Sequence, residues 1–489
     1  MSTGHVIAID QGTTNTKAIL VDMAGGIVAK ASAPLKSTYP RPGWAEQSAV
    51  EIWASVQAVI ADIMASGNYD ISGLAIANQR ETLVVWDAET GLPLTPAILW
   101  QCRRTAKVCD ALIADGANPA VVEATGLSIN ALFPASKLGW VMENVPEARS
   151  FAEQGRLRAG TVDSWLLYRL TGGKTFATDH SNASRTQLFN TQRLQWDESL
   201  CDLFHVPLSA LPDVRASNSR FGEVADGVTA LPASVPILAM MGDSHAALYG
   251  HGVRAPGLVK ATYGTGSSLM TLTPERVLSK HGLSATIAWS EQDQGVTYAL
   301  EGNITVSAQA AAFAADMLGL PDAKALSELA ETVEDSGGVT FVPALAGLGA
   351  PHWNDTVSGT ISGMTLATTR AHLARATLEA IVLQIADVFN AMEQDIEGSL
   401  HGLLADGGAS ANDLLMQLQA DLLNRPVTRS AQAEVGAIGV AAMALKNLAS
   451  LPAPSHQSDT VFQPRQEAGT WRSKVTGDWR SLLGRLTAH

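Results

Sequence analysis

Residues 6–22 read VIAIDQGTTNTKAILVD, and this stretch predicts two strands joined by a tight loop. An apolar, β-branched run at 6–9 leads into a small polar segment at 11–15, and a second apolar run follows at 18–21. Gly12 lets successive backbone amides turn toward an anion, and the neighbouring threonine hydroxyls add hydrogen-bond donors. A plain hairpin turn has a similar composition, so the loop by itself leaves a phosphate-binding role open.

The same pattern returns at residues 258–273, which read LVKATYGTGSSLMTLT. An apolar run enters a loop with Gly264, Thr265 and Gly266, and another apolar run leaves it. The two hairpins lie about 250 residues apart, which is far too long for a solenoid repeat. We therefore expect two large domains built on one plan, each with a hairpin tip directed at a shared cleft. The glycine-rich segment 250–257 predicts the boundary, with a first domain at 1–249 and a second at 250–489.

The composition and charge of the chain exclude several classes of protein. Its 489 residues are 46% hydrophobic and 16% charged, a globular composition that predicts about two to four domains rather than disorder. With 33 basic and 47 acidic side chains the net charge is −14, which argues against binding to nucleic acid or to an anionic membrane. No stretch reaches the roughly 18 apolar residues of a membrane span, and the N-terminus does not resemble a signal peptide.

Cysteine usage points to a reducing compartment. The chain has three cysteines, Cys102, Cys109 and Cys201, which cannot all pair with one another. Their spacing matches no zinc site. We therefore expect free thiols and a cytoplasmic protein.

Further strands and helices alternate along the chain, which is typical of an α/β protein. A long helical period covers 371–392, and another starts at Ala411 with Ser410 and Asp413 as its expected capping box. The segment after Leu451 is expected to form a loop followed by a closing helix. The additional strands are expected at 73–77, 83–86, 235–240, 339–342 and 402–405.

Two further features of the sequence suit a phosphate ligand and a metal ion. In the segment 403–413, LLADGGASAND, a strand ends and Gly407 and Gly408 precede a helix. These glycines permit a flat or anionic ligand to approach the helix N-terminus closely, although an ordinary loop between strand and helix would have the same composition. In the first loop, Asp10 follows a strand and can hold Mg²⁺ directly or through water, and Lys17 adds positive charge nearby.

Read together, these segments resemble the FGGY family of carbohydrate kinases, and its glycerol kinases most closely. The match extends over nearly the whole chain and keeps the family order of motifs. Besides the two hairpins it includes NQRETLVVWD at 78–87, ILWQCRRT at 98–105, TDHSNASRTQLFN at 178–190, MGDSHAALYG at 241–250 and ADGGASANDLLMQ at 405–417. The resemblance implies an α/β fold of two actin-like domains, each with a ribonuclease-H-like sheet, which bind ATP in a central cleft and close over the substrate.

The resemblance also implies roles for individual residues. Asp243, in the Gly-Asp motif, would accept the proton of the substrate hydroxyl during phosphoryl transfer. Asp10 would be the carboxylate on the metal side. The residues that would bind ATP form two groups: Gly12, Thr13, Thr14 and Lys17 around the first loop, and Thr265, Gly266, Gly408 and Asn412 in the second domain, the last two on the adenine side.

Arg80, Glu81 and Trp100 are the residues that the resemblance places at a polyol substrate. The guanidinium donates and the carboxylate accepts hydrogen bonds, which suits vicinal hydroxyls, and the indole would supply an apolar wall. Adjacent side chains of an extended segment point to opposite faces, so both charged groups can reach the substrate only if the backbone turns before Leu83. A surface ion pair and simple core packing are the alternatives for the charged pair and the tryptophan.

The chain departs from the glycerol kinase pattern at the substrate end. Leu132, or Phe133 if the alignment slips by one residue, stands where that pattern has a tyrosine, and Ser244 replaces a glutamine. These changes predict a roomier and less polar pocket, which favours a longer polyol or a ketose over glycerol. On the nucleotide side, Ala308 and Ala312 replace a glycine and a glutamine, so we expect different adenine contacts there.

Several functions are compatible with these features. The first is ATP- and Mg²⁺-dependent phosphorylation of glycerol or a closely related polyol, and the second is the same reaction on a four- or five-carbon polyol or a ketopentose such as xylulose. Where the family's xylulokinases carry a Met-His-Gly type of motif, this chain has Gln79, Arg80 and Glu81. An actin- or Hsp70-like ATPase that acts on protein partners and a non-catalytic sugar sensor are the remaining alternatives. The oligomeric state, homodimer or homotetramer, is open.

Overall fold

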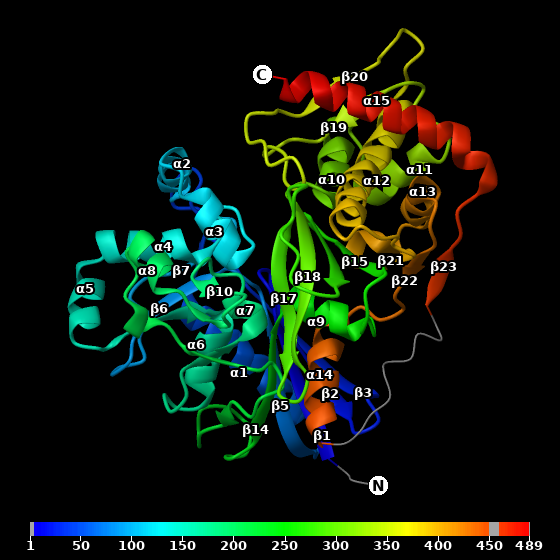
Figure 1. Ribbon diagram of the computed structural model, residues 1–489. Helices are drawn as coiled ribbons and strands as arrows, with labels where there is room; N and C mark the ends of the chain where they lie inside the picture. Colours follow the sequence, from blue (N-terminus) through cyan, green and yellow to red (C-terminus); the bar gives the residue numbers. More distant parts are fainter. Residues whose placement is uncertain (1–3, 449–458, 489) are drawn as a thin grey trace. The chain divides into compact units, whose positions relative to one another are not determined.

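The computed structural model describes residues 4–448 and 459–488 (Figure 1). The chain divides into two compact units. It passes from the first unit to the second after Gly252, inside the glycine-rich segment 250–257, and two later segments belong to the first unit again. Unit 1 consists of Met1–Gly252, Ala285–Ala299 and Glu434–Pro454, and unit 2 of Val253–Ser284, Leu300–Ala433 and Ser455–His489.

A six-stranded sheet organises unit 1, in the order β13-β14-β5-β1-β2-β3. Strands β1 and β2 form an antiparallel hairpin, β3 pairs antiparallel with β2, and β1, β5 and β14 run parallel. The strand–loop–strand prediction for 6–22 is therefore confirmed, and the carboxyl ends of three parallel strands meet at one edge of the sheet. The strands are β1 Gly4–Gln11, β2 Asn15–Asp22, β3 Ile27–Pro34, β5 Asp70–Asn78, β13 Gly222–Glu223 and β14 Pro236–Gly242.

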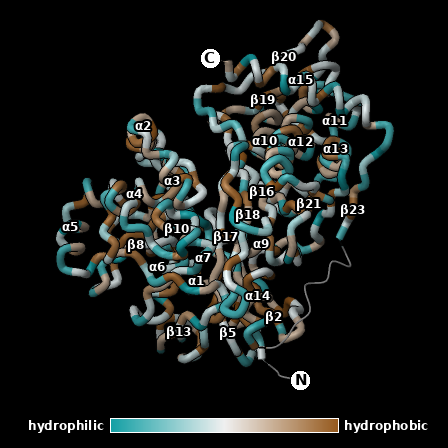
Figure 2. Tube along the Cα trace, viewed as in Figure 1, coloured by the Kyte–Doolittle hydropathy of each residue, from teal (hydrophilic) through white to brown (hydrophobic). Residues whose placement is uncertain are grey.

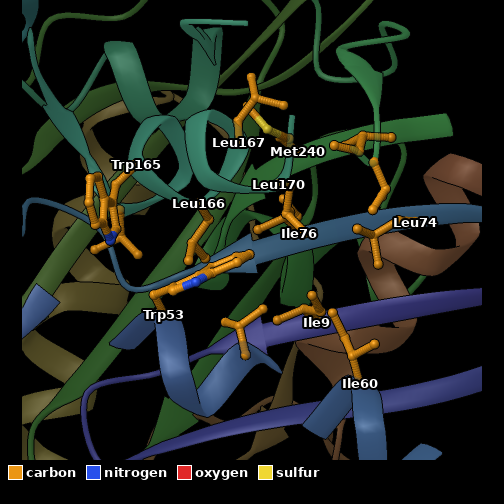
Figure 3. Close-up of a cluster of buried hydrophobic side chains, with 14 of the residues drawn as sticks. Ile9, Trp53, Ile60, Leu74, Ile76, Trp165, Leu166, Leu167, Leu170 and Met240 are labelled. Atoms are coloured by element: carbon orange, nitrogen blue, oxygen red, sulfur yellow. The ribbon is translucent and has the colours of Figure 1, made fainter. Parts of the chain in front are cut away.

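A large apolar cluster of unit 1 includes residues of this sheet. Helix α1 (Ala49–Ala65) begins after Ser48, whose hydroxyl accepts a hydrogen bond from the Glu51 amide, and it buries one apolar face. Helix α6 (Val162–Leu170) is buried along most of its length. Figure 3 shows side chains of both helices and of the strands in one cluster, among them Ile9, Trp53, Ile60, Leu74, Ile76, Trp165, Leu166, Leu170 and Met240.

Helix α14 (Val435–Leu448) lies against α9 (Asp243–Gly250) and against strands β1, β5 and β14. Two glycines permit this close packing. A Cβ atom on Gly439 would collide with the Ala246 carbonyl oxygen of α9, and one on Gly436 would lie 3.2 Å from Oδ2 of Asp10. The helix backbone therefore closes over the sheet edge where β1 and β14 end.

The remainder of unit 1 contains a four-stranded sheet, in the order β4-β7-β6-β8, with short helices around it. Its strands are β4 Glu46–Gln47, β6 Leu83–Asp87, β7 Ala97–Ile98 and β8 Leu157–Thr161. The helices are α2 Ala106–Ala114, α3 Asn118–Thr125, α4 Pro134–Asn144, α5 Pro146–Glu153, α7 His180–Ala183 and α8 Glu198–Leu203, with a 3₁₀ turn, η1, at Leu208–Ala210. Two strand pairs complete it, β9 Ala177–Asp179 with β12 Asp213–Arg215 and β10 Phe189–Asn190 with β11 Gln195–Trp196.

In unit 2 the strands β15, β16, β21 and β22 repeat the same plan within a seven-stranded sheet, whose order is β17-β18-β16-β15-β21-β22-β23. Strand β15 is antiparallel to β16 and parallel to β21, which in turn is parallel to β22. In unit 1, β1 has the same relation to β2, β5 and β14, so the prediction of two domains built on one plan is confirmed. The strands are β15 Leu258–Tyr263, β16 Ser267–Thr273, β17 Ser284–Glu291, β18 Gly295–Ile304, β21 Gly402–Asp406, β22 Val427–Arg429 and β23 Thr460–Phe462.

Helix α12 (Arg370–Asp395) confirms the predicted helix at 371–392 and begins with a capping box made by Thr369 and His372. The predicted capping box of helix α13 (Asp413–Leu423) is wrong. Residues Gly408–Ala411 form a 3₁₀ turn, η2, and the Ser410 hydroxyl donates to the Gly407 carbonyl, so that Asn412 caps the helix instead. The other elements of unit 2 are α10 Ala308–Met317, α11 Ala323–Ala330, β19 Thr340–Val342, β20 Thr360–Ser362, η3 Gln466–Ala468 and α15 Gly469–Thr487.

The remaining predictions of secondary structure also agree with the fold. Each additional strand is present, and α15 is the expected closing helix, while most of the loop predicted after Leu451 lies outside the described residues. In Figure 2 the apolar stretches follow buried strands and helices, whereas α5, of which only Ala148 is buried, is mostly hydrophilic. Among the described residues, no helix has the length and apolar character needed to cross a membrane.

Candidate active site

Asp243 lies where β14 ends and α9 begins. Its Oδ1 atom accepts a hydrogen bond from the Ser244 amide at 2.6 Å and another from Nε of Arg80 at 3.0 Å. The side chain is nevertheless 37% exposed. A carboxylate that is oriented by two donors and still accessible is suited to accept a proton from a bound hydroxyl.

Arg80 and Glu81 lie at a sharp turn between β5 and β6. Glu81 has a φ of +60°, in the left-handed region, so the backbone turn on which the sequence prediction depended is present. The Arg80 guanidinium donates to Asp243 through Nε and to the Ser244 hydroxyl through Nη2 at 3.2 Å. Both side chains are almost completely buried, which excludes the alternative of a surface ion pair.

Arg185, which the sequence analysis did not single out, holds the Glu81 carboxylate. Its Nε atom donates to Oε1 of Glu81 at 2.6 Å, and its guanidinium carbon lies 5.2 Å from the centre of the Phe133 ring. Arg185 is fully buried. It belongs to the quoted segment 178–190, but nothing in its local sequence distinguishes it from a surface arginine, because its partner lies 104 residues earlier.

Trp100 contacts the first loop, at residues 11–15, as well as residues 78–87, which carry Arg80 and Glu81 and are called the substrate segment for the role that the resemblance implies. Its indole N–H donates to the Thr13 hydroxyl at 3.1 Å, and that hydroxyl donates to the side chain of Gln79 at 3.2 Å. Trp100 is only partly buried, so simple core packing does not describe it. Leu132 is partly buried too, whereas Phe133 is buried, so Leu132 is the more accessible of the two aligned candidates.

A cluster of three buried glutamines connects the first loop to the substrate segment. The amide nitrogen of Gln79 donates to the side-chain oxygens of Gln11 at 3.2 Å and of Gln47 at 3.1 Å. The Gln47 amide in turn donates to the Thr13 carbonyl at 2.5 Å. Because these side chains satisfy one another away from water, the loop and the substrate segment form one hydrogen-bonded body.

Asp10 and Lys17 face each other across the β1–β2 hairpin. Directly opposite residues of an antiparallel pair project from the same face of the sheet. Between them Gly12 makes the turn, and its amide donates to the Asn15 carbonyl at 3.0 Å, while Thr14 is exposed. The loop thus presents one carboxylate, one ammonium group and accessible backbone at the end of β1.

The donor set around Asp10 fits Mg²⁺ rather than a metal held by protein alone. Among the described residues there is no cluster of three or more histidine, cysteine, aspartate or glutamate side chains able to hold a metal ion. Mg²⁺ is usually bound through one or two carboxylates together with phosphate oxygens and water. The space beside Oδ2 of Asp10 is kept open by Gly436, where a Cβ atom would lie 3.2 Å away.

In unit 2, the two glycine-rich loops follow neighbouring parallel strands, β15 and β21. Thr265 is exposed, and its carbonyl accepts hydrogen bonds from the Ser307 and Gln309 amides at the start of α10. A Cβ atom on Gly266 would collide with the Ile304 carbonyl oxygen. The Ala308 amide donates to the Gly264 carbonyl at 3.1 Å, and Ala312 is exposed.

Gly408 and Asn412, the two residues expected on the adenine side, differ in their surroundings. A Cβ atom on Gly408 would meet no atom within 4 Å, so the backbone there is open to a ligand. Asn412 is occupied by structural contacts: its oxygen accepts from the Leu415 amide at 3.0 Å, and its nitrogen donates to the Ser327 hydroxyl at 2.8 Å. The sequence pattern does not distinguish such a cap from a ligand contact.

Comparison with known proteins shows the family to which the chain belongs. Family models for the N-terminal and C-terminal domains of the FGGY family of carbohydrate kinases match residues 5–250 and 259–448. An apulose kinase of Pectobacterium atrosepticum is 46% identical, with 97% of this chain and 98% of that protein covered. A glycerol kinase of Symbiobacterium thermophilum is 46% identical over 91% of this chain and 90% of its own.

A solved structure gives the same result for the fold. The glycerol kinase of Plasmodium falciparum, crystallised with ADP, superposes with a TM-score of 0.91 at 31% identity and covers 99% of this chain and 98% of its own. With its two actin-like domains and its accessible carboxylate at the end of β14, the protein is an ATP-dependent phosphotransferase. It belongs to the FGGY family of carbohydrate kinases.

Proposed function

We propose that this kinase transfers the γ-phosphoryl group of ATP to a hydroxyl of a four- or five-carbon polyol or ketose, with glycerol as a weaker acceptor. The observation that carries the proposal is the engagement of Ser244. Its hydroxyl accepts a hydrogen bond from Arg80, and its short side chain reaches less far toward a substrate than the glutamine of the glycerol kinase pattern would. The half-buried Leu132 offers no hydroxyl either. A short triol would therefore leave one hydroxyl without a partner.

In this proposal Arg80 and Glu81 bind two adjacent hydroxyls of the acceptor, and Asp243 accepts the proton of the hydroxyl that is phosphorylated. Arg185 holds the Glu81 carboxylate in place from behind. Because phosphoryl transfer involves little covalent chemistry by the protein, orientation of the hydroxyl accounts for much of the rate. Gly12, Thr13, Thr14 and Lys17 are assigned to the phosphates, and Thr265, Gly266, Gly408 and Asn412 to the rest of the nucleotide.

We propose that Asp10 holds Mg²⁺, which when bound would neutralise negative charge on the transferring group. Lys17, opposite Asp10 on the neighbouring strand, supplies a second positive charge on the same face of the hairpin. Because Asp10 is assigned to the metal ion and not to the acceptor, its loss should lower turnover for every acceptor alike. The assignment of the first domain to the acceptor and of the second to the nucleotide belongs to the same proposal.

Relatives of both kinds support a small acceptor without selecting one. The apulose kinase resembles this chain over nearly its full length, and glycerol kinases do so at similar identity. Glycerol is therefore the second candidate acceptor. A cytoplasmic location is part of the proposal and agrees with the three free, buried cysteines.

A coupled assay with MgATP and a panel of acceptors tests this proposal. The panel contains glycerol, four- and five-carbon polyols, xylulose and apulose, and ATP hydrolysis without acceptor is measured in parallel. A lost partner for a buried hydroxyl costs about 1–3 kcal/mol, so we expect kcat/KM for glycerol to be roughly 5–150-fold below the best acceptor.

The Ser244→Gln variant sharpens this experiment. A glutamine fills the open space and adds a polar arm, so preference should move toward glycerol. Ser244→Ala is the matched control, because it removes the bond to Arg80 without filling space. Glycerol as best acceptor by about tenfold or more, with Ser244→Gln harmful to it, would contradict the assignment of the larger substrate.

A further inference from the structure

Lys137 lies on the first turn of helix α4, and its side chain is completely buried. Its ammonium group donates three hydrogen bonds, all to backbone carbonyl oxygens. The acceptors are Glu81 at 3.3 Å, Trp100 at 3.3 Å and Leu132 at 2.7 Å. All three residues are among those proposed for the acceptor pocket, and they come from separate segments of the chain.

We propose that Lys137 is a positioning residue that fixes the acceptor pocket, because its single ammonium group ties together the three backbone segments that carry Glu81, Trp100 and Leu132. The inference rests on the proposed function of this pocket. Lys137 itself touches no reacting atom. It acts through the backbone whose side chains meet the acceptor.

A buried lysine at this position lowers the stability of the fold unless its charge is compensated, so the three hydrogen bonds are needed to keep it there. Burial of an ammonium group is unfavourable unless its donors are satisfied. The first turn of a helix adds to the cost, because the helix dipole is positive at that end. Three carbonyls match the three donors of an ammonium group, so the buried charge is satisfied by this one arrangement of the segments.

Glu81 shows why such a tether is needed. Its φ of +60° is a conformation that non-glycine residues adopt at a cost. The bond from Lys137 to the Glu81 carbonyl holds the backbone in that turn, while Arg185 holds the carboxylate. Without the first bond the turn can relax, and the carboxylate then moves relative to Arg80.

The charge of Lys137 makes the tether sensitive to pH. The pKa of Lys137 is lowered to about 7, chiefly by burial and to a smaller extent by Arg104, while Cys102, Glu81 and Cys109 act in the opposite direction. Above that pH the neutral amine has two N–H donors for three carbonyls, so one segment loses its bond. KM for the acceptor should therefore rise above about pH 7 in the natural protein.

The experiment compares Lys137→Met, which keeps most of the length of the side chain and removes all three donors, with Lys260→Met. Lys260 is equally buried but lies on β15. With glycerol and xylulose as acceptor probes, we expect Lys137→Met to raise KM for the acceptor about tenfold or more, with KM for ATP nearly unchanged. Its pH profile should lack the rise in KM above about pH 7. Lys260→Met should keep both the acceptor KM and the rise.

Hydrogen–deuterium exchange tests the tether without reference to activity. In Lys137→Met the segments around residues 80–82, 99–101 and 130–133 should exchange faster, and the rest of unit 1 should not. If the natural protein phosphorylates neither probe, the proposed substrate fails, but exchange confined to these segments still supports the tether. An unchanged acceptor KM in an active Lys137→Met variant, or unchanged exchange in these segments, would overturn it. If that variant does not fold, the pH dependence of the natural protein provides the test. An acceptor KM that stays constant from pH 6 to 9 would then overturn the proposal.

Discussion

At the scale of single residues, the geometry of the site depends on the left-handed backbone conformation of Glu81. Glu81 is the only residue of the substrate segment with positive φ, and this turn lets two adjacent charged side chains serve the same site. Arg80 then connects to Asp243 and Ser244 on another element. The donors and acceptors of the site are therefore oriented before any ligand binds, which is how a kinase lowers the cost of alignment.

The role of Asp243 predicts the result of Asp243→Asn. The amide keeps the size of the side chain and one acceptor oxygen, so the contacts to the Ser244 amide and Arg80 can persist. It cannot accept the proton of the hydroxyl, and loss of a general base costs about 10²–10⁴-fold in rate. Steady-state kinetics should show this fall in kcat, with ATP binding by calorimetry preserved. A near-normal kcat would remove Asp243 from the mechanism.

Arg185→Met should weaken acceptor binding and lower stability. Removal of one partner of a buried ion pair leaves the other charge poorly compensated and costs about 3–5 kcal/mol. The Glu81 carboxylate would then shift toward Arg80, whose Nη1 lies 3.9 Å away. We expect a large rise in acceptor KM together with a lower melting temperature.

Arg375→Met provides the matched control for this variant. Arg375 forms a buried ion pair with Glu379 on α12, with 3.1 Å between Nε and Oε1. Its loss should also lower the melting temperature but leave the acceptor KM unchanged. If both variants had the same kinetics as the natural protein, Arg185 would contribute to folding alone.

At the scale of elements, the loop between β21 and α13 contains two adjacent glycines with different surroundings. Gly407 has a φ of +89°, and a Cβ atom there would lie 2.6 Å from the Tyr263 carbonyl oxygen. Its neighbour Gly408 has neither constraint. The fold therefore requires glycine at 407, whereas at 408 only the proposed nucleotide contact would require it.

Alanine at each of these positions tests that distinction. Gly407→Ala should lower the melting temperature, because it combines backbone strain with a collision against β15. Gly408→Ala should melt normally but raise KM for ATP by about fivefold or more, since overpacking against a ligand costs about 1–3 kcal/mol. Melting curves and ATP kinetics on both variants are the measurement. Normal ATP kinetics in Gly408→Ala would place the nucleotide elsewhere.

At the scale of the whole molecule, stability at acid pH depends on buried carboxylates such as Asp87, at the end of β6. Hydrogen bonds from Arg156 hold the pKa of Asp87 well below its usual range, against the opposing effect of burial. A depressed pKa contributes stability above the usual carboxyl pKa of about 4 and loses it as pH falls through the folded-state value.

Asp87→Asn should therefore lower the melting temperature at pH 7 and flatten its decrease below pH 4. Asp213→Asn is the control, because that side chain is 78% exposed and lies 3.7 Å from Arg215. Melting temperatures from pH 2 to 8 for both variants are the test. A decrease below pH 4 as steep as that of the natural protein would assign it to other carboxylates.

Much of this protein was determined by its sequence alone. The two glycine- and threonine-containing hairpins, at 6–22 and 258–273, predict two domains on one plan, and both hairpins form. Their apolar runs are local patterns, which is why they can be read without a structure. The motif segments 78–87 and 241–250 likewise identified Arg80, Glu81 and Asp243 as one candidate site, and the contacts between Arg80 and Asp243 bring them together.

The contacts that hold that site in place come from tertiary packing. Arg185 reaches Glu81 across 104 residues, and Lys137 reaches it across 56. Asn412, which its motif assigns to a ligand, also caps helix α13, and the expected capping residue Ser410 is part of a 3₁₀ turn. Local sequence cannot distinguish these roles, because the same residue type occurs at buried and at exposed positions. Burial and long-range pairing determine which role a residue has, and both arise only when distant segments of the chain pack together.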